Sequence, residues 1–359
     1  MNDPPAGKAN EMDSKEQLDP GSRSVLITGA AGEIGHGLIK GLRVHDDIRI
    51  VATDLKDLPE DTRDLCDEVH VGDVCDMGLM QQLIAMHEVT DLYHLAALLS
   101  TRAEHVPEVA HEVNVGGTFN LLKLCASHSA SWGRPVRFIL PSTIAVYGMA
   151  DLAQKASMGA VSEGDCNTPR TMYGCNKLYC EHLGRYYARH YRSLAEDRGT
   201  ATIDFRCLRL PGIIAAETKP TGGTSDFVPE MLHAAASGTP YTCFVREDAR
   251  IPWMTMPECI EAMLQIGRVD ENRLQNSVYN VSSFSASAGE VAEMVRSSFP
   301  GAEIEFTPDV DRQAIVDSWP ADVDTSTARA DWGFTPRWGL EEAFAEYIVP
   351  SIRTHYAQA

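Results

Sequence analysis

The stretch TMYGCNK places Tyr173 four residues before Lys177. Residues at positions i and i+4 of a helix lie one above the other, so the lysine ammonium can lie near the tyrosine phenol. A nearby positive charge favours the phenolate, lowers the pKa of the phenol and makes it a usable general base. The pair therefore predicts proton transfer on one helix face. The same spacing also occurs on many solvated helices, so the prediction needs support from other motifs.

A glycine-rich loop supplies the first support. In SVLITGAAGEIGHGL, three glycines follow an expected strand directly and open an expected helix. Glycine allows a tight turn and lets backbone N–H groups and the helix N-terminus approach a pyrophosphate. A strand before the loop and a helix after it are the context that a dinucleotide site requires. The expected cofactor-binding residues of this loop are Gly29, Gly32, Glu33, Ile34 and Gly35.

Asp54 ends the second expected strand, nineteen residues after Gly35. A carboxylate at this place can accept hydrogen bonds from both ribose hydroxyls of an adenosine. A phosphate on that ribose would lie against the negative charge, and Lys56 is the only nearby compensation, so NAD is favoured over NADP. The alternative is a carboxylate that caps the loop following the strand.

Two further strand ends complete the expected cofactor site. Asp73 and Val74 follow the third strand, where a side chain and a backbone N–H could bracket adenine. Leu95, Ala96 and Ala97 end the fourth strand, where small side chains would let the backbone lie against the cofactor. Simple packing at strand ends explains each of these residues equally well.

The elements that must position these residues follow from the hydrophobic pattern. Short apolar runs alternate with longer amphipathic stretches, which is typical of βαβ units in a parallel sheet. Expected strands cover 24–29, 48–54, 67–73, 90–97, 135–142 and 203–210, and expected helices cover 34–43, 77–87, 109–128 and 173–191. The predicted fold class is α/β, a doubly wound parallel sheet of the Rossmann type with a smaller C-terminal α/β substrate domain.

The same pattern predicts the domain organisation. Residues 1–22 are expected to be a disordered tail, and residues 23–212 an NAD-binding domain with a return segment around 239–282. Residues 213–359 are expected mainly to bind substrate, and residues 193–201 to form a surface insertion. Within the C-terminal part, residues 285–299 predict a helix with a serine cap, and residues 339–352 a closing helix with Pro350 near its end.

Bulk composition narrows the classes of partner. Lys and Arg total 31 against 51 Asp and Glu, and the net charge is −20. Such a surface repels phosphate backbones and anionic lipid, so neither nucleic acid nor a membrane is expected as a partner. No apolar run reaches the roughly eighteen residues of a membrane-spanning helix. The N-terminal residues have neither the apolar core of a secretory signal nor the composition of a mitochondrial transit peptide.

Cysteine and histidine usage predicts a cytoplasmic protein without a metal. The nine cysteines are scattered and form no CxxC pair, which argues against a disulfide framework and a zinc site and favours buried, reduced thiols. The twelve histidines show no pair at metal-ligand spacing, so the expected metal is none.

Taken together, these motifs are similar to those of a known family. The G-x-x-G-x-x-G spacing, the HLAA strand end, a PST stretch after the fifth strand and YGCNK resemble the extended short-chain dehydrogenase/reductase family, part of the NAD-dependent epimerase/dehydratase superfamily. The resemblance runs from Ser24 to about Tyr356. It implies that Thr143 is the catalytic hydroxyl beside Tyr173, that Lys177 also holds the nicotinamide ribose, and that Asn114 shapes the site. It also implies a homodimer paired through the helices at 109–128 and 173–191.

The sequence after the sixth strand departs from that of the sugar-nucleotide enzymes in this family. Those usually read R-x-x-N-V-Y-G-P, whereas this chain reads RLPGIIAAETKPTGGTSDF. That stretch, DSWPADVDTSTARADWGF and HLAALLS are similar to the short-chain type of L-threonine 3-dehydrogenase. This resemblance implies NAD-dependent oxidation of the β-hydroxyl of L-threonine to 2-amino-3-oxobutanoate. A related β-hydroxy acid substrate, a nucleotide-sugar epimerase or dehydratase, and an NAD sensor without turnover stay open as alternatives.

Hydroxyl and glycine residues are expected to bind this small zwitterion. The Gly222-Gly223 turn offers bare N–H groups, and the residues after it add hydroxyls. The loop around them is expected to close over substrate. Turn chemistry without a ligand, and plain core packing for Trp253, are the alternatives. The expected substrate-binding residues are Ser100, Ser142, Thr143, Tyr173, Gly223, Thr224, Ser225 and Trp253.

Overall fold

A seven-stranded parallel sheet forms the centre of the computed structural model, which describes residues 23–44, 47–196, 203–220 and 222–358. The expected tail at 1–22 lies outside the described residues, as does part of the expected insertion at 193–201. The strand order is β11-β7-β5-β4-β1-β2-β3. The strands are β1 (Arg23–Thr28), β2 (Ile48–Asp54), β3 (Glu68–Val71), β4 (Asp91–His94), β5 (Arg137–Thr143), β7 (Asp204–Leu210) and β11 (Val278–Asn280). The predicted doubly wound α/β fold is confirmed.

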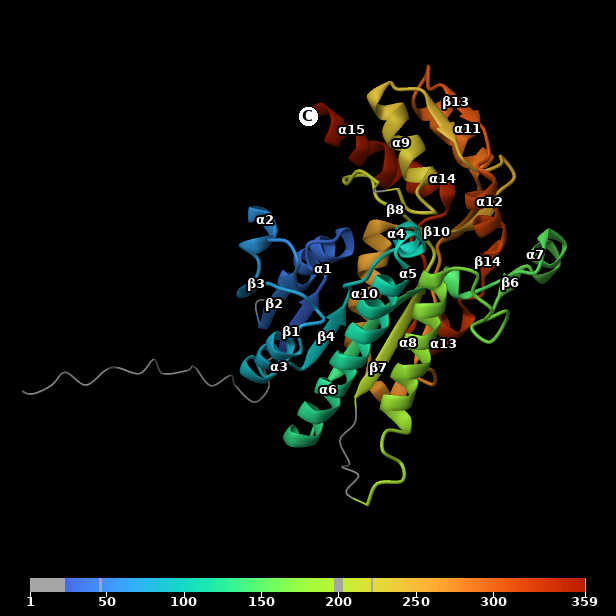
Figure 1. The fold of residues 1–359 in the computed structure, drawn as a ribbon. Coiled ribbons are helices and arrows are strands. Elements are labelled where there is room, and N and C mark those ends of the chain that lie inside the picture. The colour runs from blue at the N-terminus through green and yellow to red at the C-terminus, as the bar shows by residue number, and fades with distance from the viewer. Residues whose placement is uncertain (1–22, 45–46, 197–202, 221, 359) are drawn as a thin grey trace, which may run out of the picture.

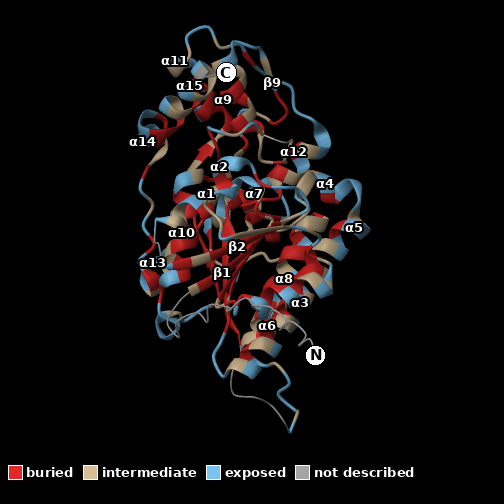
Figure 2. Ribbon diagram, turned by 90° about the vertical axis from the view of Figure 1, so that its left-hand side faces the viewer, coloured by how far each residue is buried: buried red, intermediate tan, exposed pale blue. Residues whose placement is uncertain are grey.

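Apolar runs make the central strands because helices cover both faces of the sheet. On one face, α1 (Glu33–Arg43) packs against α10 (Met256–Arg268). On the other lie α3 (Met77–Met86), α6 (Thr118–Trp132) and α8 (Met172–Arg189). Buried residues accordingly fill the sheet and the inner helix faces (Figure 2). The C-terminal half contributes to this layer structure through β11 and α10, while the division into domains stays a prediction.

The remaining C-terminal elements form a second core beyond the carboxyl end of the sheet (Figure 1). A three-stranded sheet joins β8 (Gly212–Ile214), β10 (Arg250–Thr255) and β12 (Phe284–Ser287). Two separate two-stranded sheets pair β9 (Tyr241–Cys243) with β13 (Ile304–Phe306) and β6 (Ala160–Val161) with β14 (Asp322–Val323). The helices around it are α9 (Phe227–Ser237), α11 (Ala288–Ser298), α12 (Val310–Asp317), α14 (Leu340–Ala343) and α15 (Val349–Gln358).

Two predictions for the C-terminal helices have different outcomes. Ser287 caps α11 as predicted, and its side chain accepts a hydrogen bond from the backbone N–H of Glu290. The prediction that the closing helix ends near Pro350 is wrong, because α15 continues to Gln358. A π-helical segment, η4 (Phe344–Ile348), precedes the proline and changes the backbone hydrogen-bond register where the proline has no N–H to donate. None of the helices in the described ranges is long and apolar enough to cross a membrane.

Candidate active site

Tyr173 and Lys177 lie on the first two turns of α8 and face the same side. The helix start is fixed by two side chains: Thr171 accepts a hydrogen bond from the backbone N–H of Gly174 at 3.0 Å, and Glu104 accepts one from that of Met172 at 2.7 Å. Lys177 is only 4% exposed, and its Nζ lies 5.8 Å from the centroid of the Tyr173 ring. The structure therefore brings the two residues together as their spacing predicts.

Burial dominates the electrostatics of this pair. It raises the pKa of the Tyr173 phenol above its ordinary value, and the nearby Cys180 and Cys207 thiols act in the same direction. Burial likewise lowers the pKa of the Lys177 ammonium. The expectation that Lys177 lowers the phenol pKa is wrong for this structure, because the loss of water around the phenol has the larger effect. Both groups are shifted toward their uncharged forms.

Thr143 and Ser142 end strand β5, and their side chains point in opposite directions as neighbours in a strand must. The Thr143 hydroxyl accepts a hydrogen bond from the backbone N–H of Ala145 at 3.1 Å and so begins the short 3-10 helix η2 (Ile144–Val146), against which α8 packs. The Ser142 hydroxyl is buried and donates to the Glu181 carboxylate at 2.6 Å. Glu181 in turn pairs with the buried Arg209. The expectation that Ser142 contacts substrate is therefore wrong.

Asn114 holds the segment that follows β4. It lies in a π-helical turn, η1 (Glu112–Gly117), and π-turns of this kind are frequent at functional sites. Its side-chain amide accepts a hydrogen bond from the backbone N–H of Leu98 at 2.7 Å and donates one to the carbonyl of the same residue at 3.0 Å. Both bonds fix the chain directly after Leu95, Ala96 and Ala97. The asparagine thus acts on the expected cofactor surface through the backbone of this segment.

His94 links the ends of β1 and β4 beneath this surface. One ring nitrogen lies 2.8 Å from the Thr28 hydroxyl, and the other lies 2.9 Å from the Thr118 hydroxyl. Burial, together with the positive charge of Lys177, lowers the pKa of His94 to about 3. The ring is therefore neutral at physiological pH and serves to hold the strand ends. Thr118 lies more than twenty residues from its partner in the sequence, so no local pattern indicates this contact.

The glycine-rich loop has the close contacts that a dinucleotide site needs. Gly29 has a φ of +71°, and a Cβ added to it would lie 2.4 Å from the backbone nitrogen of Ala96. A Cβ on Gly35 would lie 2.3 Å from the carbonyl oxygen of Ala30. Gly32 is the N-cap of α1, with Glu33 and Ile34 in its first turn. Only glycine fits at 29 and 35, and the free N–H groups at the start of α1 remain directed toward the loop.

The Asp54 carboxylate caps the loop that follows β2, which is the alternative interpretation of this residue. It accepts hydrogen bonds from the backbone N–H groups of Ala31 and Lys56, each at 3.0 Å. A carboxylate has about four acceptor positions, so two remain for ribose hydroxyls. Asp73 accepts a hydrogen bond from the backbone N–H of Cys75 at 2.9 Å, and the Val74 side chain is buried in the core beside Gly117. The hydrogen bonds of Asp54 and Asp73 thus orient the chain at the ends of β2 and β3.

The expected substrate loop is held by α4 (Ser100–His105). The Ser100 hydroxyl lies 3.2 Å from the Thr224 hydroxyl, and Thr101 donates a hydrogen bond to the carbonyl of Gly222 at 2.8 Å. The expectation of a bare N–H at Gly223 is wrong, because this group donates to the Asp226 carboxylate at 2.6 Å. Ser225 follows in the same loop and is half-buried. The structure thus brings Ser100 and Thr224 together from distant parts of the chain.

Glu33 and Arg312 contribute to this loop in ways that the sequence did not indicate. Glu33 lies near Thr218 and Asp226, and burial raises the pKa of its carboxyl group. Arg312, from α12, donates a hydrogen bond to the carbonyl of Gly223 at 2.9 Å. Both contacts join elements whose proximity depends on the tertiary fold. A sequence motif could not have identified either one.

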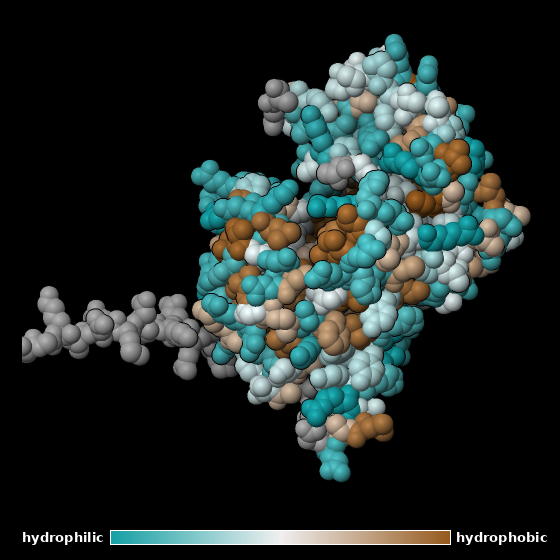
Figure 3. All heavy atoms as spheres, in the orientation of Figure 1, coloured by the Kyte–Doolittle hydropathy of each residue, from teal (hydrophilic) through white to brown (hydrophobic). Residues whose placement is uncertain are grey.

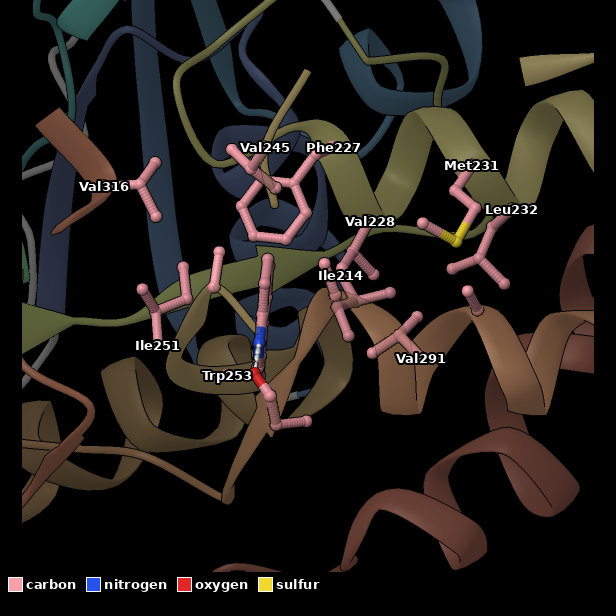
Figure 4. Packing of buried hydrophobic residues seen from close by; sticks show 14 of the residues in the cluster. Ile214, Phe227, Val228, Met231, Leu232, Val245, Ile251, Trp253, Val291 and Val316 are labelled. Atoms are coloured by element: carbon pink, nitrogen blue, oxygen red, sulfur yellow. Dashed lines mark hydrogen bonds between the residues drawn. The ribbon is translucent and has the colours of Figure 1, made fainter. Parts of the chain in front are cut away.

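Trp253 belongs to the C-terminal core, so the expectation that it lines a substrate pocket is wrong. Its side chain is 0% exposed, its indole N–H donates to the carbonyl of Ala286 at 3.1 Å, and its ring packs edge-on against Phe227 with 5.2 Å between centroids. Figure 4 shows this tryptophan among Ile214, Val228 and other apolar side chains. The alternative of plain core packing is the correct one.

Comparisons with known proteins find relatives along nearly the whole chain. The mitochondrial L-threonine 3-dehydrogenase of Bos taurus is 32% identical over 319 residues, which is 89% of this chain and 80% of that protein. The structure of L-threonine 3-dehydrogenase from Trypanosoma brucei is 30% identical with a TM-score of 0.79, covering 93% of this chain and 98% of that one. A monomeric L-threonine 3-dehydrogenase from a metagenome is 32% identical with a TM-score of 0.79, covering 92% and 99%. UDP-glucose 4-epimerase from Thermotoga maritima, at 18% identity, 94% and 100% coverage and a TM-score of 0.75, shares the fold alone.

A family model matches the part of the chain that contains the expected cofactor site. The model of the NAD dependent epimerase/dehydratase family matches residues 25–282, which include the glycine-rich loop, Asp54, Tyr173 and Lys177. The tight turn at Gly29, the N-terminus of α1 and the carboxylate at the end of β2 fit a dinucleotide, and NAD is the cofactor of this enzyme. On the length of this match, the chain belongs to the NAD dependent epimerase/dehydratase family.

Proposed function

We propose that this protein is an NAD-dependent L-threonine 3-dehydrogenase, which oxidises the β-hydroxyl of L-threonine to 2-amino-3-oxobutanoate. The observation that carries the proposal is the identity of about a third with threonine dehydrogenases over nearly the whole chain. The placement of Tyr173 and Lys177 on one face of α8, which packs against the helical turn begun by Thr143, supports it.

The residues of the chain have distinct roles in the proposed reaction. Thr143 and Tyr173 hold the β-hydroxyl of the substrate, and the Tyr173 phenolate accepts its proton. Lys177 lies beside the phenol and would hold the nicotinamide ribose. Because burial raises the pKa of the phenol, formation of the phenolate would depend on the positive charge of oxidised NAD bound beside it. The glycine-rich loop and Asp54 would hold NAD, which would supply the hydride acceptor for the substrate carbon. Asn114 contributes by fixing the segment after β4, and much of the rate comes from this positioning.

Ser100, Thr224 and Ser225 are the proposed ligands of the amino acid. The hydroxyls of Ser100 and Thr224 already lie within 3.2 Å of each other, and Ser225 is the next residue of the loop. Hydroxyl groups both donate and accept hydrogen bonds, so such a cluster can serve a carboxylate and an ammonium group at once. Because Gly223 donates its N–H to Asp226, we assign it to shaping the loop.

The structure offers little support for a sugar-nucleotide epimerase. The arginine that would clamp a diphosphate in such an enzyme, Arg250, pairs with the Glu290 carboxylate at 2.5 Å and donates a hydrogen bond to the carbonyl of Ser285 at 3.0 Å. These contacts use two of the five N–H donors of the guanidinium within the protein. The likeness to an epimerase structure is also at 18% identity, well below that to the threonine dehydrogenases.

The Tyr173→Phe variant tests the proposed base. Removal of the phenol oxygen should lower turnover of L-threonine by roughly 10²- to 10⁴-fold, the usual contribution of a general acid or base. NAD affinity, measured by calorimetry, should change little. Tyr179→Phe is the matched control, because that tyrosine is exposed on the same helix and should keep full activity. Undiminished NADH formation by Tyr173→Phe would remove this residue as the base.

Substrate identity requires a parallel assay on the unmodified protein. NADH absorbance is followed with L-threonine, L-serine or 3-hydroxybutyrate, and sugar products are followed with a UDP-sugar. Threonine-dependent NADH formation is the expected result. Faster turnover of another β-hydroxy acid would reassign the substrate, sugar interconversion would favour the epimerase, and NAD binding without any turnover would favour a sensor.

A homodimer formed through α6 and α8 is part of the proposal. Phe119 on α6 and Tyr179 and Tyr186 on α8 are between 43% and 54% exposed, so both helices offer aromatic side chains to a partner. Figure 3 shows hydrophobic side chains scattered among hydrophilic ones on the face that carries these helices. Since a relative is described as monomeric, light scattering at micromolar concentration is the test of whether this protein forms a dimer.

We further propose a cytoplasmic location, in keeping with nine free cysteines.

A further inference from the structure

A carboxylate and two imidazoles meet at the edge of the central sheet, on strand β3 and at the end of α3. Glu68 and His70 lie two residues apart on the edge strand β3, so their side chains point to the same face. His87 follows α3 directly, and α3 covers this face. One possible ligand atom from each of the three side chains lies within 4.8 Å of the other two.

The distances within this cluster match those between the ligands of a tetrahedral metal ion. Glu68 Oε2 lies 3.2 Å from His70 Nε2 and 3.4 Å from His87 Nε2. Ligands at the roughly 2.0–2.2 Å typical of zinc, arranged tetrahedrally, are about 3.3–3.5 Å apart. Two of the three separations thus already suit an ion, and the third, between the two imidazoles, is within 4.8 Å.

His87 supplies the second observation. Its side chain is 3% exposed, and its Nε2 is buried without a hydrogen-bond partner although it points toward Glu68. An unpaired polar atom in the protein interior costs free energy and needs an explanation. A metal ion bound between the three residues would satisfy this nitrogen. The side chains of His70 and Glu68 are 30% and 36% exposed, so an ion and a completing water molecule could reach the site.

Arg49 orients the carboxylate but also opposes cation binding. Its guanidinium, on the neighbouring strand β2, donates to Glu68 Oε1 at 2.6 Å and leaves Oε2 directed at the imidazoles. Partners of this kind fix the orientation of a metal ligand. The positive charge beside the site reduces the affinity for a cation. The combination favours an ion that binds imidazole strongly over calcium or magnesium, which prefer all-oxygen sites.

We propose that Glu68, His70 and His87 form a binding site for a divalent transition-metal ion of the zinc class. Two histidines and one glutamate, with water in the fourth position, are an established ligand set for zinc. The site revises the sequence-level expectation of no metal, because His70 and His87 are too far apart in the sequence to form a recognisable motif. It lies beside α3 and is separate from the proposed catalytic residues on α8.

Metal titration of the full chain tests the site. After dialysis against a chelator, zinc is titrated in competition with a chromophoric chelator. The unmodified protein should bind one equivalent, and His70→Gln and His87→Gln should each bind it at least about tenfold more weakly. His190→Gln, at an exposed histidine at the end of α8, is the matched control and should bind zinc normally. Absence of zinc binding, or equal losses in all three variants, would overturn the proposal.

A second measurement uses the unmodified protein and so does not depend on whether the variants fold. Diethyl pyrocarbonate modifies accessible neutral imidazoles, and peptide mass spectrometry locates the modified residues. Zinc should protect the partly exposed His70 from modification and leave the modification of His190 unchanged. Equal modification of His70 with and without zinc would contradict the site. Neither measurement depends on turnover, so the outcome is independent of the proposed dehydrogenase activity.

Discussion

Substitution of Gly174 by alanine should move Tyr173, the proposed base, away from Thr143. Gly174 follows Tyr173 directly and lies where the first turn of α8 crosses η2. A Cβ added here would lie 2.1 Å from the carbonyl oxygen of Ala145 and 2.9 Å from the Cβ of Pro169. Since real Cβ contacts are not closer than 3.0 Å, the helix and η2 must move apart by about 1 Å. Thr143, which begins η2, then moves relative to Tyr173.

Two magnitudes follow from this displacement. Overpacking of this kind lowers the free energy of unfolding by about 1–3 kcal/mol. A misplacement of about 1 Å at the reacting groups can reduce kcat about 10²-fold. Most of the expected NAD contacts lie on the glycine-rich loop and β2, and only Lys177 shares α8 with Gly174, so NAD affinity should fall by less than the 10²-fold loss of kcat. Turnover is measured by NADH absorbance, NAD affinity by calorimetry and stability by urea unfolding.

Gly78→Ala is the matched control, because Gly78 is exposed in the first turn of α3 and the nearest atom to its added Cβ is the Asp76 Oδ1 at 3.3 Å. This change should leave turnover intact and should be neutral for stability or increase it by up to about 1 kcal/mol. If Gly174→Ala retained full turnover and stability, close packing of α8 on η2 would not be what positions Tyr173.

Two further variants test buried charges and hydroxyls. Asp91 is buried between Arg23 and Arg137, which keep its pKa low, so its stabilising effect is present above about pH 4 and is lost as the pH falls through the lower pKa of the folded state. Asp91→Ala should therefore lower the free energy of unfolding at pH 7 by about 3 kcal/mol. This value is at the lower end of the range for a broken buried ion pair, because both arginines are about a quarter exposed. In urea unfolding measurements, the free energy of unfolding of the variant should also depend less on acid pH. Ser142→Ala should cost about 1 kcal/mol of stability through the lost bond to Glu181 with little change in KM, and a large rise in KM would restore Ser142 to the substrate site.

The parts of the fold that the sequence predicts are those governed by local patterns. The central strand β1 is buried from Ser24 to Thr28, and its sequence accordingly contains the apolar run Val25, Leu26 and Ile27. The loop of Gly29 and Gly35 is recognisable because backbone contacts exclude any side chain there. The i, i+4 placement of Tyr173 and Lys177 follows from helix geometry alone. These features need no knowledge of distant contacts.

The direction of individual side chains depends on partners elsewhere in the chain. Ser142 and Thr143 are adjacent hydroxyl residues, and only the buried Glu181 shows which of them faces inward. Trp253 lies in a strand next to the expected pocket, but its ring packs against Phe227, a residue on another element that only the tertiary fold brings close. The pKa of Tyr173 depends on how much water surrounds it, which spacing does not reveal. Tertiary burial decided each of these outcomes.

The loop that carries Gly222, Gly223 and Thr224 contacts both α4 and the C-terminal helix α12. Thr101, on the helix after β4, donates to the carbonyl of Gly222, and Arg312, from the C-terminal helix α12, donates to the carbonyl of Gly223. The hydroxyl of Thr224 lies beside that of Ser100 on the cofactor side. A shift of α12 would therefore move the loop and change the distance between these two hydroxyls. Substitutions in α12 lie remote from the reacting groups and should thus affect KM more than kcat. The reason is that binding of the proposed substrate requires Ser100 and Thr224 to keep their relative position.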